Sequence, residues 1–92
     1  MLITTEFGGG VDEYFGRSPA LSLALPDSSS FPELFTALAP HCSIPIDNLY
    51  KNGEICPGYL LLVNDADYEL LGKDYKLQDR DVVAIISLVH GG

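Results

Sequence analysis

The stretch VVAIISLV, residues 82–89, decides how this chain of 92 residues folds. It is almost continuously apolar and rich in β-branched side chains, which is typical of a strand in the middle of a sheet. His90, Gly91 and Gly92 follow it. Glycines at a terminus pack no side chain and carry the largest backbone entropy, so they add nothing to a core. The sequence therefore predicts a central strand that runs into a short tail, residues 90–92.

A hairpin is expected at the other end of the chain. Residues 1–7, MLITTEF, alternate in polarity as a strand does, and the glycines at positions 8–10 suit the positive φ angles of a turn. The return segment is ALSLAL, in which Leu21, Leu23 and Leu25 share one face. The two segments predict a pair of antiparallel strands.

One helix is expected after this hairpin. Ser30 and Glu33 form the S-x-x-E pattern of a capping box, in which the serine accepts from an early helical amide and the glutamate reaches back. Pro40 ends the helical pattern. The apolar residues between these limits recur at helical spacing and predict a stripe facing the core: Phe31, Leu34, Phe35 and Leu38.

The second half of the chain predicts further strands. Residues 41–57 are typical of a loop, with a short edge hairpin around the Asn52-Gly53 turn. Residues 60–63, LLLV, suit a strand covered on both faces, and residues 67–71, DYELL, predict a short strand running back.

The order of these elements favours one architecture. Parallel pairing of the first and last strands, with the helix as a right-handed crossover on one face, buries every apolar stripe. The predicted fold class is α+β, a β-grasp of the ubiquitin-like kind, with a mixed sheet of four to five strands and one main helix. Residues 1–89 would form this domain and residues 90–92 a flexible reactive tail.

Charge and hydropathy restrict the partners. Thirteen acidic residues against five basic ones give a net charge of −8, which repels a phosphate backbone and favours basic protein surfaces. We therefore expect no direct nucleic-acid binding. No apolar run approaches the roughly 20 residues of a membrane span, so no membrane partner is expected. The start of the chain carries neither a signal nor a transit pattern, which predicts a cytoplasmic protein with access to the nucleus.

An acidic segment resembles the opening of a calcium loop without completing it. Asp65, Asp67 and Glu69 have the right spacing, but Leu70 stands where the loop requires glycine and Lys76 where it requires glutamate. We expect an acidic turn in which Asp65 and Asp67 face a protein partner.

The cysteines carry no recognisable motif. Cys42 and Cys56 lack the spacing of a redox or zinc site, which predicts two reduced, largely buried thiols. Only a coincidence of folding would join them with His41 and His90 around a metal, so no metal ion is expected. No catalytic triad pattern and no phosphate-binding glycine motif is present, and we expect neither an enzyme nor a bound cofactor.

The tail remains as the candidate for chemistry. A carboxylate on two residues without side chains can thread a narrow channel and reach the α-phosphate of ATP. The resulting acyl-adenylate is open to attack by a sulfur or nitrogen nucleophile. The alternative is a frayed terminus without function.

The C-terminal half resembles the ubiquitin-related modifier family. The similar motifs are the Pro57-Gly58 pair before an apolar strand, the run NDADYELLG from residue 64, the run LQDRDVV from residue 77, and the final LVHGG. The N-terminal half agrees more loosely, through FGGG at residues 7–10 and LALP at residues 23–26. His90 before the glycines separates this tail from those of ubiquitin and of the sulfur carriers of molybdopterin and thiamine synthesis.

The resemblance implies a sulfur carrier that is also a protein modifier. Gly92 would become a thiocarboxylate for thiolation of the wobble uridine of tRNA, and would also be attached to lysines of target proteins. Gly91 and His90 would thread into an adenylating enzyme with a rhodanese-like domain, and a tRNA thiolation complex would be the next partner. Leu88 would join Asp65 and Asp67 in the partner surface.

Two alternatives stay open at this point. One is a dedicated sulfur carrier for molybdopterin or thiamine synthesis, which would form a stable complex with a synthase and no protein conjugates. The other is a β-grasp interaction module with an inert end.

Overall fold

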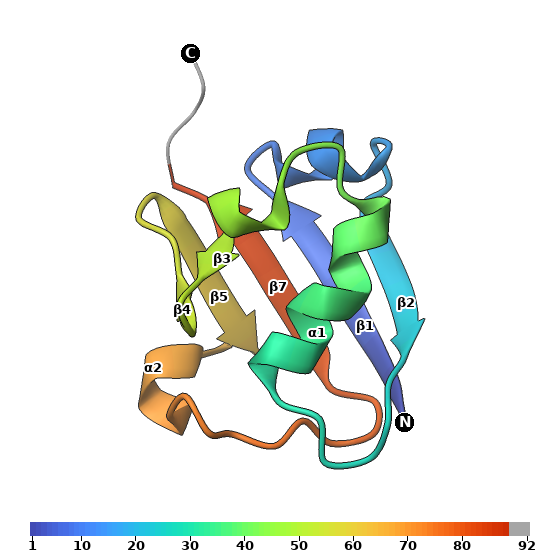
Figure 1. Cartoon of the computed structure of the whole chain (residues 1–92), viewed down its shortest axis with the longest axis vertical. Coiled ribbons are helices and arrows are strands. Elements are labelled where there is room, and N and C mark those ends of the chain that lie inside the picture. The colour runs from blue at the N-terminus through green and yellow to red at the C-terminus, as the bar shows by residue number, and fades with distance from the viewer. Residues whose placement is uncertain (89–92) are drawn as a thin grey trace.

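The computed structural model describes residues 1–88 and contains a mixed sheet with one main helix on one face. Figure 1 shows helix α1 lying across this sheet. The strands in spatial order are β2 (Ala20–Ala24), β1 (Leu2–Gly8), β7 (Val82–Ser87), β5 (Tyr59–Val63) and β6 (Ala66–Asp67). The predicted β-grasp architecture is confirmed.

Strand β7 occupies the centre, as its composition predicts. It runs parallel to β1, with Thr5 opposite Val83, and antiparallel to β5, with Leu61 opposite Ile85. The side chains of Val83, Ile85 and Leu61 are fully buried under the helix. Residues from both ends of the chain therefore meet in the middle of the core.

The expectation that residues 60–63 form a strand covered on both faces is wrong. Leu60, Leu62, Ala84 and Ile86 alternate with the buried positions and are only half-buried. The described chain has one main helix, and it packs on one face, so the other face of the sheet stays open.

The hairpin of β1 and β2 is confirmed, but its connection is longer than a tight turn. Gly9 and Gly10 adopt positive φ angles of 64° and 100°, and the chain then forms the 3-10 helix η1 (Val11–Phe15). Val11 and Phe15 are buried there, and the ring of Phe15 stacks on that of Phe7 at 4.1 Å. Two buried residues within a five-residue segment are too few to establish a helical period.

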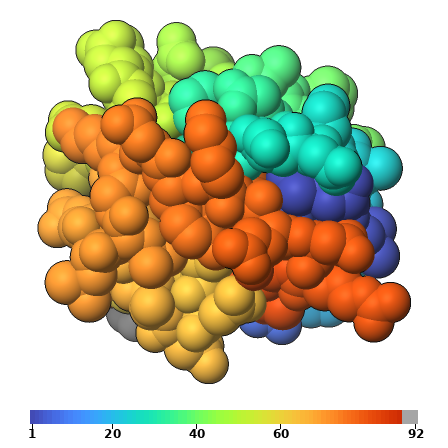
Figure 2. Space-filling model, turned by 90° about the horizontal axis from the view of Figure 1, so that it is seen from below, coloured from blue at the N-terminus to red at the C-terminus, as the bar shows by residue number. Residues whose placement is uncertain are grey.

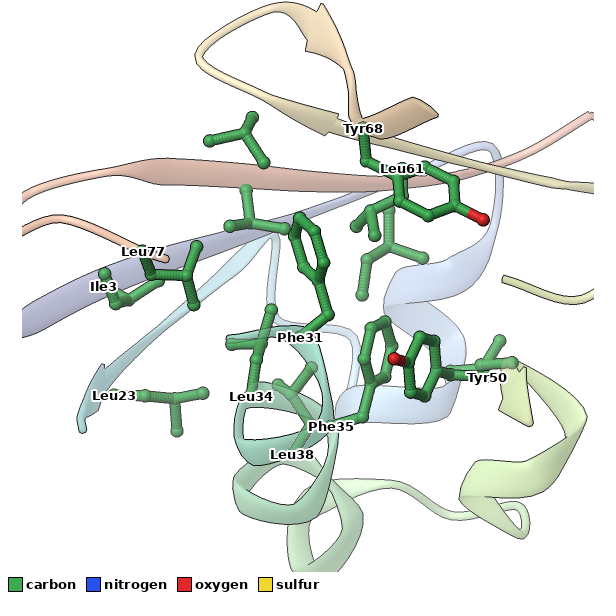
Figure 3. Packing of buried hydrophobic residues seen from close by; sticks show 14 of the residues in the cluster. Ile3, Leu23, Phe31, Leu34, Phe35, Leu38, Tyr50, Leu61, Tyr68 and Leu77 are labelled. Carbon is green, nitrogen blue, oxygen red and sulfur yellow. The ribbon is translucent and has the colours of Figure 1, made fainter. Parts of the chain in front are cut away.

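Helix α1 (Phe31–Leu38) begins at the predicted capping box. Glu33 Oε1 accepts hydrogen bonds from the backbone N–H of Ser30 at 2.8 Å and from its hydroxyl at 2.9 Å. The helix ends where expected, and the 3-10 turn η2 (Ala39–His41) follows. Figure 3 shows the predicted stripe in the core: Phe31, Leu34, Phe35 and Leu38.

The segment after the helix contains the predicted edge hairpin. The 3-10 turn η3 (Ile46–Asn48) leads into β3 (Tyr50–Lys51) and β4 (Glu54–Ile55), which form a separate two-stranded sheet. Asn52 and Gly53 supply the positive φ angles of the turn, 55° and 78°.

The prediction of a strand over residues 67–71 is wrong. Strand β6 ends at Asp67, and Tyr68–Leu71 form the short helix α2. The carboxylate of Asp67 accepts from the backbone N–H of Glu69 at 2.9 Å, so this residue caps the helix and turns the chain.

A buried carboxylate holds the connection from α2 to β7. Asp81 accepts hydrogen bonds from the Asn64 amide, the Tyr75 hydroxyl and the Gln78 backbone N–H, each at 2.9 Å. Leu77 of this connection is buried in the core. Figure 2 shows the connection spread over the end of the molecule that lies at the bottom of Figure 1. Among residues 1–88, no helix has the length and apolar content needed to span a bilayer.

Candidate functional site

The predicted reactive tail, residues 90–92, follows strand β7 in the sequence, and Figure 1 shows where β7 ends. Strand β7 ends at Ser87, and the backbone N–H of Leu88 donates to the Gly58 carbonyl at 2.8 Å. The Leu88 side chain is 62% exposed, and its role in a partner surface stays a prediction. The three tail residues on which the chemistry was predicted, His90, Gly91 and Gly92, lie outside the described residues.

An apolar face lies beside the base of the tail. Side chains alternate across a strand, so the residues of β7 and β5 that avoid the helix point to the open side of the sheet. Cross-strand pairing sets Leu60 opposite Ile86 and Leu62 opposite Ala84. We call the half-buried residues on this side the open apolar face: Leu60, Leu62, Val82, Ala84 and Ile86. Leu88 continues the same alternation along the chain.

Acidic residues border the open apolar face. Asp67 pairs with Leu62 on one side, and Glu6 pairs with Ala84 on the other, so all four side chains share the open side. Glu6 is exposed, whereas one oxygen of Asp67 caps α2. Two of the predicted surface residues, Asp67 and Leu88, therefore border one surface.

The third predicted surface residue, Asp65, lies in the turn between β5 and β6. It is exposed and has a positive φ angle of 69°, and its neighbour Asn64 has one of 49°. Both angles are those of a tight hairpin turn. Asp65 is thus an acidic turn residue, as expected.

The cysteines do not add a reactive centre to this surface. Cys42 and Cys56 are free and half-buried, and the Cys56 thiol donates to the Asp47 carbonyl at 3.2 Å. Within residues 1–88, no group of three His, Cys, Asp or Glu side chains could hold a metal ion.

A separate groove lies on the helix side of the molecule. It has a volume of about 230 Å³ and lies between α1 and the segment from η3 to β3. Its lining includes the stacked, buried rings of Phe35 and Tyr50 and the exposed side chains of Asp47 and Lys51. No histidine or cysteine lines it, and it offers no nucleophile paired with a base.

The sequence model of the family described as Urm1 (Ubiquitin related modifier) matches residues 2–92. The chain belongs to the ubiquitin-related modifier family. It is 39% identical to ubiquitin-related modifier 1 of Schizosaccharomyces pombe over 97 residues, with full coverage of both chains. It is 37% identical to the human protein of the same name over 95 residues, which cover 98% of this chain and 94% of that one.

A solved relative shares the fold of this ubiquitin-related modifier. The solution structure of Urm1 from Trypanosoma brucei superimposes with a TM-score of 0.80 at 32% identity, covering 99% of this chain and 95% of that one. The predicted resemblance is thereby confirmed. The family is one of ubiquitin-like modifiers and sulfur carriers rather than catalysts, so the chain is not an enzyme, as expected.

The open apolar face is the part of the site that the sequence did not reveal. Leu61 and Val63 are buried, whereas Leu60 and Leu62, which alternate with them, face outward. Because all four are apolar, their alternation is invisible in the polarity pattern. The predicted order of elements could have indicated this face, because a single helix covers only one side of a sheet.

Proposed function

We propose that this ubiquitin-related modifier carries sulfur on Gly92 for 2-thiolation of the tRNA wobble uridine, and that it is also conjugated to lysines of target proteins. Family membership and the LVHGG ending support this assignment. The single observation that carries it is the exit of β7 beside the open apolar face. A partner that docks on this face has the start of the tail within reach.

The chemistry requires activation of a carboxylate. The Gly92 carboxylate attacks the α-phosphate of ATP, and pyrophosphate leaves, which gives an acyl-adenylate. A persulfide sulfur of the partner then attacks the acyl carbon and AMP leaves. Cleavage of the resulting disulfide by a thiol releases the thiocarboxylate and a new disulfide. A lysine amine that attacks an activated acyl group instead displaces the activating group and forms an isopeptide bond.

The open apolar face suits the docking step. Its five residues are half-buried in the free chain, and Leu88 adds an exposed side chain at the tail. A patch of apolar residues with an acidic border is complementary to an apolar patch ringed by basic residues. The net charge of −8 favours the same partner. We expect this docking to weaken as the salt concentration rises.

The test is the intact mass of the chain after reaction. Incubation with an adenylating enzyme that has a rhodanese-like domain, ATP and a sulfur donor should add about 16 mass units, the exchange of one oxygen for sulfur at an acyl centre. The matched control is deletion of Gly92, which removes the reacting carbonyl from its position. A chain of unchanged mass would contradict the proposal. A stable complex with a molybdopterin or thiamine synthase, without protein conjugates, would favour the dedicated carrier.

A further inference from the structure

The end of β7 is in direct backbone contact with the turn after β1. Gly9 has a φ angle of +64°, and a Cβ atom placed on it would lie 2.3 Å from the Ser87 carbonyl oxygen and 3.1 Å from the Ser87 nitrogen. Carbon and oxygen atoms that are not bonded normally stay more than 3 Å apart. Only glycine allows the two backbones to approach this closely.

The other side of β7 is held by the turn before β5. The backbone N–H of Leu88 donates to the Gly58 carbonyl at 2.8 Å, one step beyond the last sheet pair, Tyr59 with Ser87. This turn is closed by a hydrogen bond from the Tyr59 N–H to the Cys56 carbonyl at 3.3 Å. Gly58 has a φ angle of 93°, which is a conformation that favours glycine.

These contacts involve backbone atoms of Ser87 and Leu88. The exposed Leu88 side chain contributes little packing of its own in the free chain. We infer that Gly9 and the Gly58 carbonyl form a backbone clamp that fixes the point from which the reactive tail leaves the sheet. Both are positioning residues, because they act through Ser87 and Leu88. This role rests on the proposed function.

The clamp separates docking from chemistry. On the proposed function, the open apolar face binds the activating enzyme, whereas the clamp fixes the point on the sheet from which the chain leads toward Gly92. A displacement of about 1 Å at a reacting centre can lower a rate about a hundredfold. Loosening the clamp should therefore lower kcat for adenylation and leave KM for the modifier nearly unchanged.

Gly9→Ala is the first test, with Gly10→Ala as its matched control. Both positions have positive φ angles and impose the same kind of strain on alanine, but a Cβ at Gly10 meets no atom within 4 Å. We expect Gly9→Ala to lower kcat for ATP–pyrophosphate exchange about tenfold or more and to speed hydrogen exchange of the Leu88 amide. Gly10→Ala should change neither. Equal kcat values for the two variants would overturn the inference.

A second pair of variants tests the other half of the clamp. Leu88→Pro removes the N–H that donates to Gly58, whereas Leu88→Ala keeps it and shortens the side chain. We expect both to raise KM through lost docking area, and only Leu88→Pro to lower kcat. This pair decides the matter if Gly9→Ala does not fold. Equal kcat values here would likewise refute the clamp.

Adenylation of the wild-type chain distinguishes a failure of this inference from a failure of the proposed function. A wild-type chain that is not adenylated refutes the proposed function, and the positioning role with it. A wild-type chain that is adenylated, with clamp variants at full kcat, refutes the positioning role alone. Amide exchange at Leu88 reports the clamp in the free protein without the activating enzyme.

Discussion

Phe35 of α1 and Tyr50 of β3 stack face to face, with ring centroids 4.3 Å apart and ring planes 3° from parallel. The contact attaches the small sheet of β3 and β4 to the helix, and Figure 3 shows it at one end of the core. Burial raises the pKa of the Tyr50 hydroxyl, and the negative charge of Glu33 acts in the same direction. Because the ring makes the stacked contact, we expect the ring rather than the hydroxyl to stabilise this region.

Replacement of Tyr50 tests the contribution of the stacked ring. Tyr50→Ala should lower the free energy of unfolding by about 3–5 kcal/mol, since it leaves a cavity beside Phe35. Tyr50→Phe keeps the ring and should remain within about 1 kcal/mol of wild type. Urea denaturation of both variants measures the difference. Similar losses for the two would mean that the hydroxyl matters more than the ring.

Thr5 offers a stabilising substitution. Its hydroxyl is fully buried and has no hydrogen-bond partner within residues 1–88. Thr5→Val keeps the shape and removes the unpaired group, so it should raise stability by about 1 kcal/mol or more. Thr4→Val, at a half-buried position on the open side of the sheet, is the control and should change little. A Thr5→Val protein that melts below wild type would reveal a partner for the hydroxyl.

Asp81 should be essential for the connection between α2 and β7. Asp81→Asn replaces one acceptor oxygen by a donor that faces existing donors, and should cost about 1.5–3 kcal/mol. Asp74→Asn, on the exposed surface of the same connection, should be nearly neutral. Thermal unfolding followed by circular dichroism compares them. Equal melting temperatures for the two variants would show that the hydrogen bonds of Asp81 make no net contribution to stability.

The capping box makes stability depend on acidic pH. The backbone N–H of Ser30, then its hydroxyl, lowers the pKa of Glu33 below its usual 4.5. A lowered folded-state pKa means that the stabilisation is present above the usual pKa and is lost as pH falls through the lowered one. NMR titration of the Glu33 carboxyl checks the direction. Ser30→Ala should return the pKa toward 4.5 and flatten the loss of stability below that pH.

The open apolar face should govern affinity for the activating enzyme. Ile86→Glu places a charge in this face and should raise KM for the modifier about tenfold or more. Leu70→Glu is the control, because Leu70 is 84% exposed on α2 and lies outside the face. Adenylation kinetics with both variants measure the effect, after thermal unfolding has established that each is folded. A larger rise in KM for Leu70→Glu than for Ile86→Glu would place the docking surface on α2.

The parts of the fold that the sequence predicted well have local or periodic causes. Ser30 and Glu33 are three residues apart and bond to each other, and the apolar stripe of α1 has one clear period. Strand β7 is predicted by composition alone because a central strand is apolar over most of its length. In each case the signal lies within a few neighbouring residues.

The parts that were missed depend on contacts between distant segments. Phe15 is buried because it stacks on Phe7 across a turn, and nothing near either residue indicates this pairing. Asp67 could equally extend a strand or cap a helix, and the cap prevails at the end of the two-residue β6. The clamp on Ser87 was hidden because it joins backbone atoms from distant parts of the chain.

The parallel pairing of β1 with β7 has a consequence during translation. Every other described element is synthesised before β7, yet β7 is the central strand that joins β1 to β5. The nascent chain therefore cannot assemble its sheet until residues 82–87 have left the ribosome, and it waits with β1 and β5 unjoined. Chains that stop early present no ordered open face to an activating enzyme. Strand β7 comes shortly before Gly91 and Gly92 in the sequence. The last step of synthesis therefore supplies these glycines and also completes the fold on which their proposed chemistry depends.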